Sequence, residues 1–145
     1  MRIKTLKVKS KTENLSVVRD FISSAAAEIN IPKDVAENII LAVDEACTNI
    51  IKHAYKYSPD GEIIVKVKPS LSKFVVSIID NGLSFEPDSI PEPDLQKYYR
   101  QRRVGGLGVY LMKTLMDEVK YVSKPGKYNE VLLSKNLKVT QQNAG

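Results

Sequence analysis

Three polar residues of the sequence are spaced so that they can act together. Glu45, Asn49 and His53 are each four residues apart, so on a helix they lie within roughly 80° of one another and form one polar strip. The amide oxygen of Asn49 suits Mg²⁺, a hard cation that prefers oxygen ligands. The structural alternative is that Glu45 pairs with Lys52 or Lys56 on the surface and that His53 fills the edge of the core.

A carboxylate stands at the end of an apolar segment, in the run Asp80-Asn81-Gly82. At the end of a strand, Asp80 can accept a hydrogen bond from an exocyclic amine, and Gly82 has no side chain to block a flat base. This combination suits adenine. The structural alternative is an ordinary Asp-Asn-Gly turn.

A third run, Gly105-Gly106-Leu107-Gly108, precedes a helical pattern. Glycines allow close backbone approach, and the first turn of a helix presents free amide donors to an anion, so the run favours phosphate binding. Residues 95–116 contain no acid and include Arg100, Arg102 and Arg103, which adds positive charge. A tight turn with close helix packing is the structural alternative. The run is no Walker loop, because no Gly-Lys-Ser or Gly-Lys-Thr follows.

The elements that must position these residues follow from hydrophobic periodicity. In chain order we expect a strand within 1–12, helices over 12–30 and 32–57, strands over 62–68 and 73–80, a loop over 81–104, a helix opening at 105–108 and ending near 116, and strands over 119–123 and 131–137. Consecutive strands joined by turns argue against a Rossmann fold. The predicted class is α+β, a two-layer sandwich with the helices on one face of a mostly antiparallel mixed sheet.

Length and composition limit the number of domains and the class of protein. With 145 residues, 43% hydrophobic and 27% charged, the chain has the size of one domain, which we expect over 1–138, followed by a short polar tail over 139–145. The single cysteine, Cys47, excludes an internal disulfide and favours a cytoplasmic protein. No apolar run is long enough to span a membrane. The net charge of +5 comes without a nucleic-acid-binding motif, so we expect neither membrane nor direct nucleic-acid binding.

The segments 45–55, 80–82 and 105–108 resemble, in order and spacing, the N, G1 and G2 boxes of the GHKL ATPases, the group that contains the ATP sites of gyrase, heat-shock-ninety, histidine-kinase and mismatch-repair proteins. The runs Asp44-Glu45-Ala46 and Leu115-Met116-Asp117-Glu118-Val119 are most similar to those of the bacterial anti-sigma factor serine/threonine kinases. The resemblance implies a Bergerat-type ATP-binding fold with ATP and Mg²⁺ as cofactors.

The resemblance also implies roles for individual residues. Asn49 would be the magnesium ligand, Asp80 the reader of adenine and Glu45 the general base on the attacking hydroxyl. The other implied nucleotide-binding residues are His53, Gly82, Gly105, Gly106, Leu107, Gly108 and Asn129, with Arg100, Arg102 and Arg103 as candidates for the γ-phosphate contact and residues 83–104 as the ATP lid.

Two positions depart from the pattern of the superfamily. Ser84 replaces a common glycine, which predicts a stiffer lid hinge, and Asn129 stands where relatives often carry threonine near the base. We expect the amide of Asn129 to reach the adenine edge through water.

The function implied is that of a cytoplasmic protein kinase, usually a homodimer, that transfers the γ-phosphoryl group of ATP to a serine or threonine of an anti-sigma factor antagonist and sequesters a sigma factor. The alternative is a nucleotide-gated module that binds its partner without phosphoryl transfer, for which Glu45 would have no catalytic use. The ATP domain of a sensor histidine kinase is disfavoured, because His53 is the only histidine and lies inside the proposed site.

Overall fold

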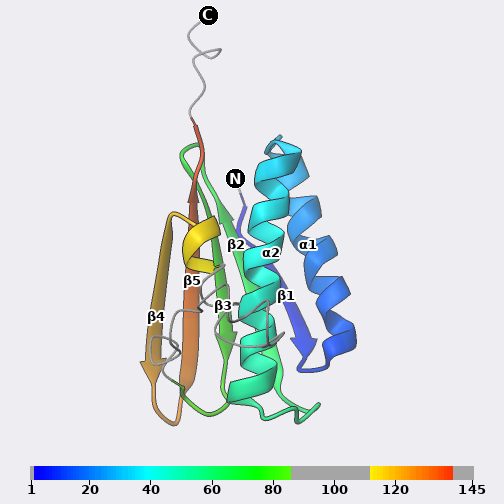
Figure 1. Ribbon diagram of the computed structural model, residues 1–145, viewed down its shortest axis with the longest axis vertical. Helices are drawn as coiled ribbons and strands as arrows, with labels where there is room; N and C mark the ends of the chain where they lie inside the picture. Colours follow the sequence, from blue (N-terminus) through cyan, green and yellow to red (C-terminus); the bar gives the residue numbers. More distant parts are fainter. Residues whose placement is uncertain (1, 86–111, 139–145) are drawn as a thin grey trace, which may run out of the picture.

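The computed structural model describes residues 2–85 and 112–138. Within these residues the chain forms a five-stranded sheet of order β1-β2-β3-β5-β4, in which every neighbouring pair is antiparallel (Figure 1). The strands are β1 (Lys4–Lys9), β2 (Glu62–Pro69), β3 (Lys73–Asp80), β4 (Glu118–Lys124) and β5 (Tyr128–Asn136). The predicted α+β class and its antiparallel sheet are confirmed, and the described pairings include no parallel one.

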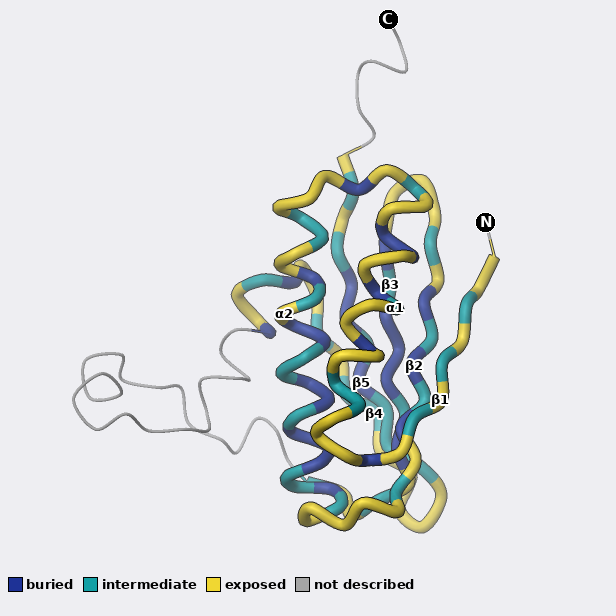
Figure 2. The backbone as a smooth tube through the Cα atoms, turned by 90° about the vertical axis from the view of Figure 1, so that its right-hand side faces the viewer, coloured by how far each residue is buried: buried dark blue, intermediate teal, exposed yellow. Residues whose placement is uncertain are grey.

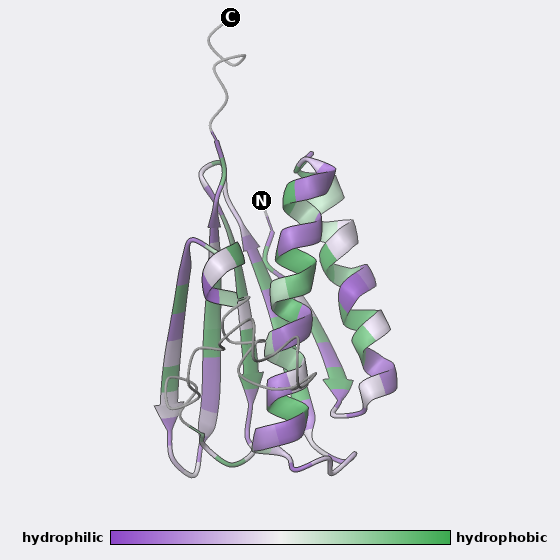
Figure 3. Cartoon of the chain, in the orientation of Figure 1, coloured by the Kyte–Doolittle hydropathy of each residue, from purple (hydrophilic) through white to green (hydrophobic). Residues whose placement is uncertain are grey.

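Two helices, α1 (Leu15–Glu28) and α2 (Lys33–Asn49), cover one face of the sheet (Figure 2). A short 3₁₀ turn over Thr12–Asn14 precedes α1, where the sequence suggested a helix from residue 12. Apolar and polar residues alternate along both helices (Figure 3), and the buried ones, such as Ile22 of α1 and Ile39 of α2, belong to the core that the helices share with the strands. The largest fully buried side chains are Phe74, Ile22, Ile39, Ile63, Ile78, Met112, Leu133, Val18, Val43, Val65, Val67 and Val76. This core holds α2 against the sheet and so fixes the position of its polar residues.

The junction between the two helices is a tight reversal. Asn30 has a φ of 58°, the left-handed conformation that asparagine tolerates better than most residues. The amide of Ile31 donates to the Ala26 carbonyl over 3.1 Å, and that of Asn30 to the Ala27 carbonyl over 3.1 Å. These bonds satisfy carbonyls at the end of α1, and α2 can then begin directly after Pro32.

The end of the second helix differs from the prediction of a regular helix to residue 57. The α-helix ends at Asn49, and residues Ile50–Ala54 form a π-helix, η2. Its wider turn is closed by a 3.0 Å bond from the Tyr55 amide to the Ile50 carbonyl. Lys56 and Tyr57 then adopt positive φ values of 51° and 66°, which stops the helix. Single π turns inside helices often occur at functional sites.

The first strand, β1, lies at one edge of the sheet. Lys7 and Lys9 are exposed, whereas Leu6 and Val8 are partly buried against the core. Among the described helices, none has both the length and the apolar character needed to cross a bilayer.

Candidate functional site

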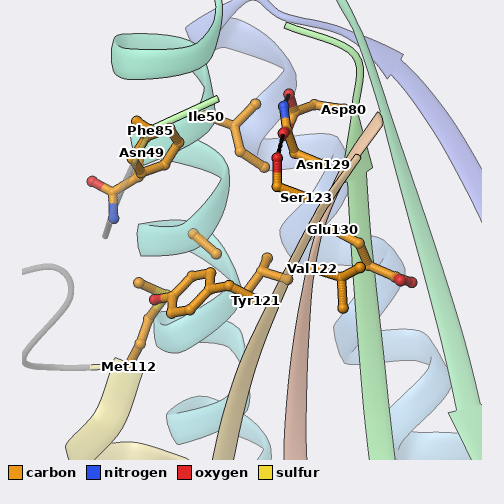
Figure 4. Close-up of a pocket in the computed structure, with 12 residues that line it drawn as sticks. Asn49, Ile50, Asp80, Phe85, Met112, Tyr121, Val122, Ser123, Asn129 and Glu130 are labelled. Atoms are coloured by element: carbon orange, nitrogen blue, oxygen red, sulfur yellow. Dashed lines mark hydrogen bonds between the residues drawn. The ribbon is translucent and has the colours of Figure 1, made fainter. Parts of the chain in front are cut away.

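A pocket of about 470 Å³, measured with its open mouth, lies between the C-terminal half of α2 and the strands β3, β4 and β5 (Figure 4). It is lined by Ala46, Asn49, Ile50, Asp80, Phe85, Met112, Tyr121, Val122, Ser123, Asn129, Glu130 and Val131. Asn49 and Asp80, predicted from two separate segments to share a site, thus line one cavity. The pocket walls are largely apolar and its polar groups are few, as is typical of small-molecule sites.

Asp80 is the most deeply buried acid of this pocket, with 4% of its surface exposed. Its Oδ1 accepts a hydrogen bond from the Gly82 amide at 2.9 Å and another from Asn129 Nδ2 at 3.0 Å. Burial raises the pKa of this carboxyl, and the two hydrogen bonds oppose the rise. Oδ2 has no hydrogen-bond partner among the described residues, so it is available to a donor in the pocket.

Asn49 occupies the last residue of α2, directly before the π turn. Only 9% of its surface is exposed, yet its amide nitrogen has no hydrogen-bond partner within the described residues. A buried amide without a partner costs free energy unless a ligand completes its contacts. The carboxamide therefore fits a residue whose partner is a ligand, and its oxygen is of the kind that Mg²⁺ prefers.

Glu45 lies one helical turn before Asn49 on the same side of α2 and is half-buried. No described residue forms a hydrogen bond or an ion pair with it, so the alternative of pairing with Lys52 or Lys56 is wrong. Burial, and then the neighbouring Asp44, raise the pKa of Glu45. A carboxylate with a raised pKa is a better proton acceptor than an ordinary one, as a general base requires.

His53 lies on the π turn beside the segment that follows β3. Its ring is 5.3 Å from the ring of Phe85, centroid to centroid, with the planes tilted by 42°. Partial burial and the positive charges of Lys52 and Lys56 lower the pKa of His53, so the imidazole is neutral at pH 7. His53 does not line the pocket; Phe85, which packs against it, does.

Gly82 is required for a reason that the sequence did not indicate. A Cβ at this position would lie 2.6 Å from the carbonyl oxygen of Ala54 and 2.8 Å from its carbonyl carbon. The next amide, of Leu83, donates to the same oxygen at 2.8 Å. Gly82 thus lets the chain after β3 lie directly on the end of η2, and this contact connects the Asp80 side of the pocket with the Asn49 side.

The β4–β5 hairpin supplies most of the pocket-lining residues that were not predicted from the sequence. Tyr121, Ser123 and Val131 come from these strands, and Asp80 pairs with Asn129, which pairs with Ser123. Only the strand register, which is formed between distant segments, brings them together. The predicted residues Arg100, Arg102, Arg103, Gly105, Gly106, Leu107 and Gly108, and the lid beyond Phe85, lie outside the described residues.

Comparison with known families agrees with this geometry. The model of the histidine kinase-like ATPase domain matches residues 8–135, which include all of the described pocket. The chain belongs to this family. The predicted GHKL assignment is therefore confirmed, and membership of an ATPase family implies that this domain uses ATP.

Two curated relatives are similar over most of their length. The serine-protein kinase RsbW of Bacillus subtilis is 36% identical over 126 residues, which cover 83% of this chain and 78% of the relative. The protein of the same name from Listeria monocytogenes is 36% identical over 146 residues, which cover 97% and 92%. The prediction that this ATPase domain is a kinase is confirmed.

Two solved structures share the fold. The RsbU and RsbW domains of Rv1364c from Mycobacterium tuberculosis match with a TM-score of 0.66 at 16% identity, over 93% of this chain and 32% of that longer chain. The histidine kinase domain of a blue-light activated kinase from Erythrobacter litoralis matches with a TM-score of 0.54 at 19% identity, over 90% of this chain and 63% of that chain.

Proposed function

We propose that this protein is a serine/threonine protein kinase that transfers the γ-phosphoryl group of ATP to a small antagonist protein. One observation carries the proposal: Asn49 and Asp80 line the same pocket, and Glu45, which forms an ion pair with no described residue, lies one turn away on the same side of α2. The names of the two relatives, both serine-protein kinases, support a hydroxyl as the acceptor.

Each of these residues has a task that its surroundings suit. Asp80, with a free Oδ2, accepts a hydrogen bond from the exocyclic amine of adenine. Asn49 holds Mg²⁺ through its amide oxygen; the ion, when bound, neutralises charge on the phosphates. Glu45 takes the proton from the attacking hydroxyl. No residue in the described part of the chain forms an ion pair with Glu45, and this favours the catalytic role over a module that only binds, because a half-buried carboxylate without a partner costs stability and such a module needs no general base.

The partners follow from the resemblance to the anti-sigma factor kinases. We propose that the protein acts in the cytoplasm as a homodimer, holds a sigma factor inactive and releases it when the antagonist is bound unphosphorylated. Phosphorylation of the antagonist would then return the kinase to the sigma factor. The segments 105–108 and 100–103 would contribute the phosphate cradle and an arginine contact to the γ-phosphate.

The test is phosphoryl transfer to a native partner. Proteins that copurify with the chain from its host would be incubated with it, Mg²⁺ and γ-labelled ATP, and the label would be located by mass spectrometry. We expect phosphoserine or phosphothreonine on one small partner, and no label with a Glu45→Gln variant. Partner binding that depends on nucleotide but yields no label would support the binding-module alternative instead.

A further inference from the structure

A polar row crosses three strands at the rim of the pocket. The register pairs Asp80 of β3 with Asn129 of β5, and Asn129 with Ser123 of β4. Directly paired residues point to the same face of a sheet, so all three side chains lie on the face that carries the helices. Figure 4 shows Asp80, Asn129 and Ser123 together at one end of the pocket, while the carboxylate of Glu130 points away from it.

Among the described residues, the amide nitrogen of Asn129 has a partner for each of its two hydrogens. Its nitrogen donates to Asp80 Oδ1 at 3.0 Å and to the Gly82 carbonyl at 3.1 Å. Its oxygen lies 2.8 Å from Ser84 Oγ and 2.7 Å from Ser123 Oγ, and the two hydroxyl oxygens lie 2.8 Å from each other. Because the two hydroxyl hydrogens can fill only two of these three contacts, at least one of the serines donates to the amide oxygen. An asparagine side chain has two donor hydrogens, and both are bound here, so Asn129 has no donor left for a base or a bridging water.

The serines also fix which way this amide points. With the amide turned over, its oxygen would face two other acceptors, Asp80 Oδ1 and the Gly82 carbonyl, and both bonds would be lost. The observed orientation is favoured, because it places the amide oxygen beside two hydroxyl groups of which at least one donates to it. Ser84 and Ser123 therefore keep the Asn129 amide as a donor toward Asp80.

The orientation of the Asn129 amide determines how Asp80 is held. Its Oδ1 holds two hydrogen bonds, from Gly82 and Asn129, and these set the plane of the carboxylate. Only Oδ2 is left for a ligand, and it is an acceptor. A donor such as the 6-amino group of adenine pairs with it, whereas the 6-oxo group of hypoxanthine or guanine presents a second acceptor and is rejected.

We propose that Asn129 is a positioning residue that sets the preference of this site for a 6-amino purine over a 6-oxo purine, and that it does so through Asp80 without touching the base. The inference rests on the proposed function, since it requires that the pocket binds a nucleotide. The water-mediated contact of Asn129 with adenine that the sequence suggested stays a separate prediction, which only the amide oxygen could make, because both amide hydrogens are bound by Asp80 and Gly82.

The test compares ADP with inosine diphosphate, which carries a 6-oxo group in place of the 6-amino group. Isothermal titration calorimetry would give both dissociation constants for the wild type and for Asn129→Leu, which keeps the volume but removes the hydrogen bonds. We expect ADP binding to weaken about tenfold, the equivalent of one hydrogen bond to a charged group, and inosine diphosphate binding to change by less than about twofold. The preference for ADP would shrink accordingly.

A second variant tests the same inference in case Asn129→Leu does not fold. Ser84→Ala combined with Ser123→Ala leaves Asn129 in place but no longer orients it, and we expect the ADP preference to fall by about threefold. Ser77→Ala is the matched control: Ser77 Oγ donates to Glu130 on the opposite face of the same sheet, and its loss should leave the preference unchanged.

The possible outcomes distinguish the role of Asn129 from the existence of the nucleotide site. If both diphosphates weaken equally, or the preference is unchanged in the folded variants, Asn129 only supports the structure and the inference is overturned. If the wild type binds neither diphosphate, the proposed nucleotide site itself is refuted, and the inference with it.

Discussion

Replacement of Gly82 by alanine should loosen the connection between the two halves of the pocket. The new Cβ would lie 2.6 Å from the Ala54 carbonyl oxygen, whereas carbon–oxygen contacts are normally about 3.3 Å or longer, so the chain must move by roughly 0.7 Å. The 2.8 Å bond from Leu83 to the same oxygen is strained by that movement. Overpacking costs about 1–3 kcal/mol and the lost bond about 1 kcal/mol.

The expected loss of stability is therefore about 2–4 kcal/mol, or a fall in Tm of roughly 5–15 °C for a domain of this size. Differential scanning calorimetry would measure it. We also expect ADP binding to weaken, because the Gly82 amide donates to Asp80 Oδ1 at 2.9 Å and moves with the chain. A Tm within about 2 °C of the wild type and unchanged ADP affinity would refute the reasoning.

Two controls isolate the steric origin of this effect. Gly126→Ala meets no atom within 4 Å but has a φ of 78°, so it should cost only about 1–2 kcal/mol of backbone strain. Adding Ala54→Gly to Gly82→Ala removes a 3.0 Å contact with the Ala54 Cβ but not the clash with the carbonyl, so it should not restore stability.

The remaining predictions concern the polar residues of the site. Glu45→Gln should abolish phosphoryl transfer and keep ATP affinity within about twofold. It should also raise Tm at pH 7, because burial raises the pKa of Glu45 and the ionised carboxylate is therefore less stable in the folded chain than in the unfolded one. For the same reason the rate of transfer should increase with pH through a pKa above that of an ordinary glutamate; a flat profile in rapid-quench assays would exclude Glu45 as the base. Asn49→Ala should remove the gain in ATP affinity that Mg²⁺ provides, measured by calorimetry with and without the ion. It should change Tm little, because the amide nitrogen of Asn49 has no hydrogen-bond partner to lose among the described residues. Asp80→Asn should weaken ADP binding by about 10- to 100-fold without lowering Tm, because it removes a charged acceptor that burial disfavours; equal ADP binding would exclude Asp80 as the adenine contact.

The elements could be predicted from the sequence because most of them bury one face. The alternation in residues 62–68 and 73–80 fixes which side chains point inward, and β2 and β3 extend over Glu62–Pro69 and Lys73–Asp80. The helical stripes were found for the same reason. The π turn could not be predicted, because over the five residues of Ile50–Ala54 a wider turn buries the same apolar residues as an α-helix.

The site was predictable only in part. Asp80 and Asn49 were identified because their types and positions suit a base and a cation, and the structure places both at one pocket. The roles of Asn129, Ser84 and Ser123 depend on contacts between segments that are distant in the sequence. Asp80 and Asn129, for example, are 49 residues apart. Hydrophobic patterning specifies the face of each strand but not which polar residues become neighbours along the row, so this network needed the structure.

The proposed function requires that an adenine nucleotide binds between Asp80 and Asn49. A crystal structure of the chain with ADP and Mg²⁺ tests it most directly. We expect the 6-amino group within hydrogen-bond distance of Asp80 Oδ2 and the Asn49 amide oxygen on the magnesium ion. A nucleotide bound elsewhere, or bound in this pocket with its base away from Asp80, would contradict it.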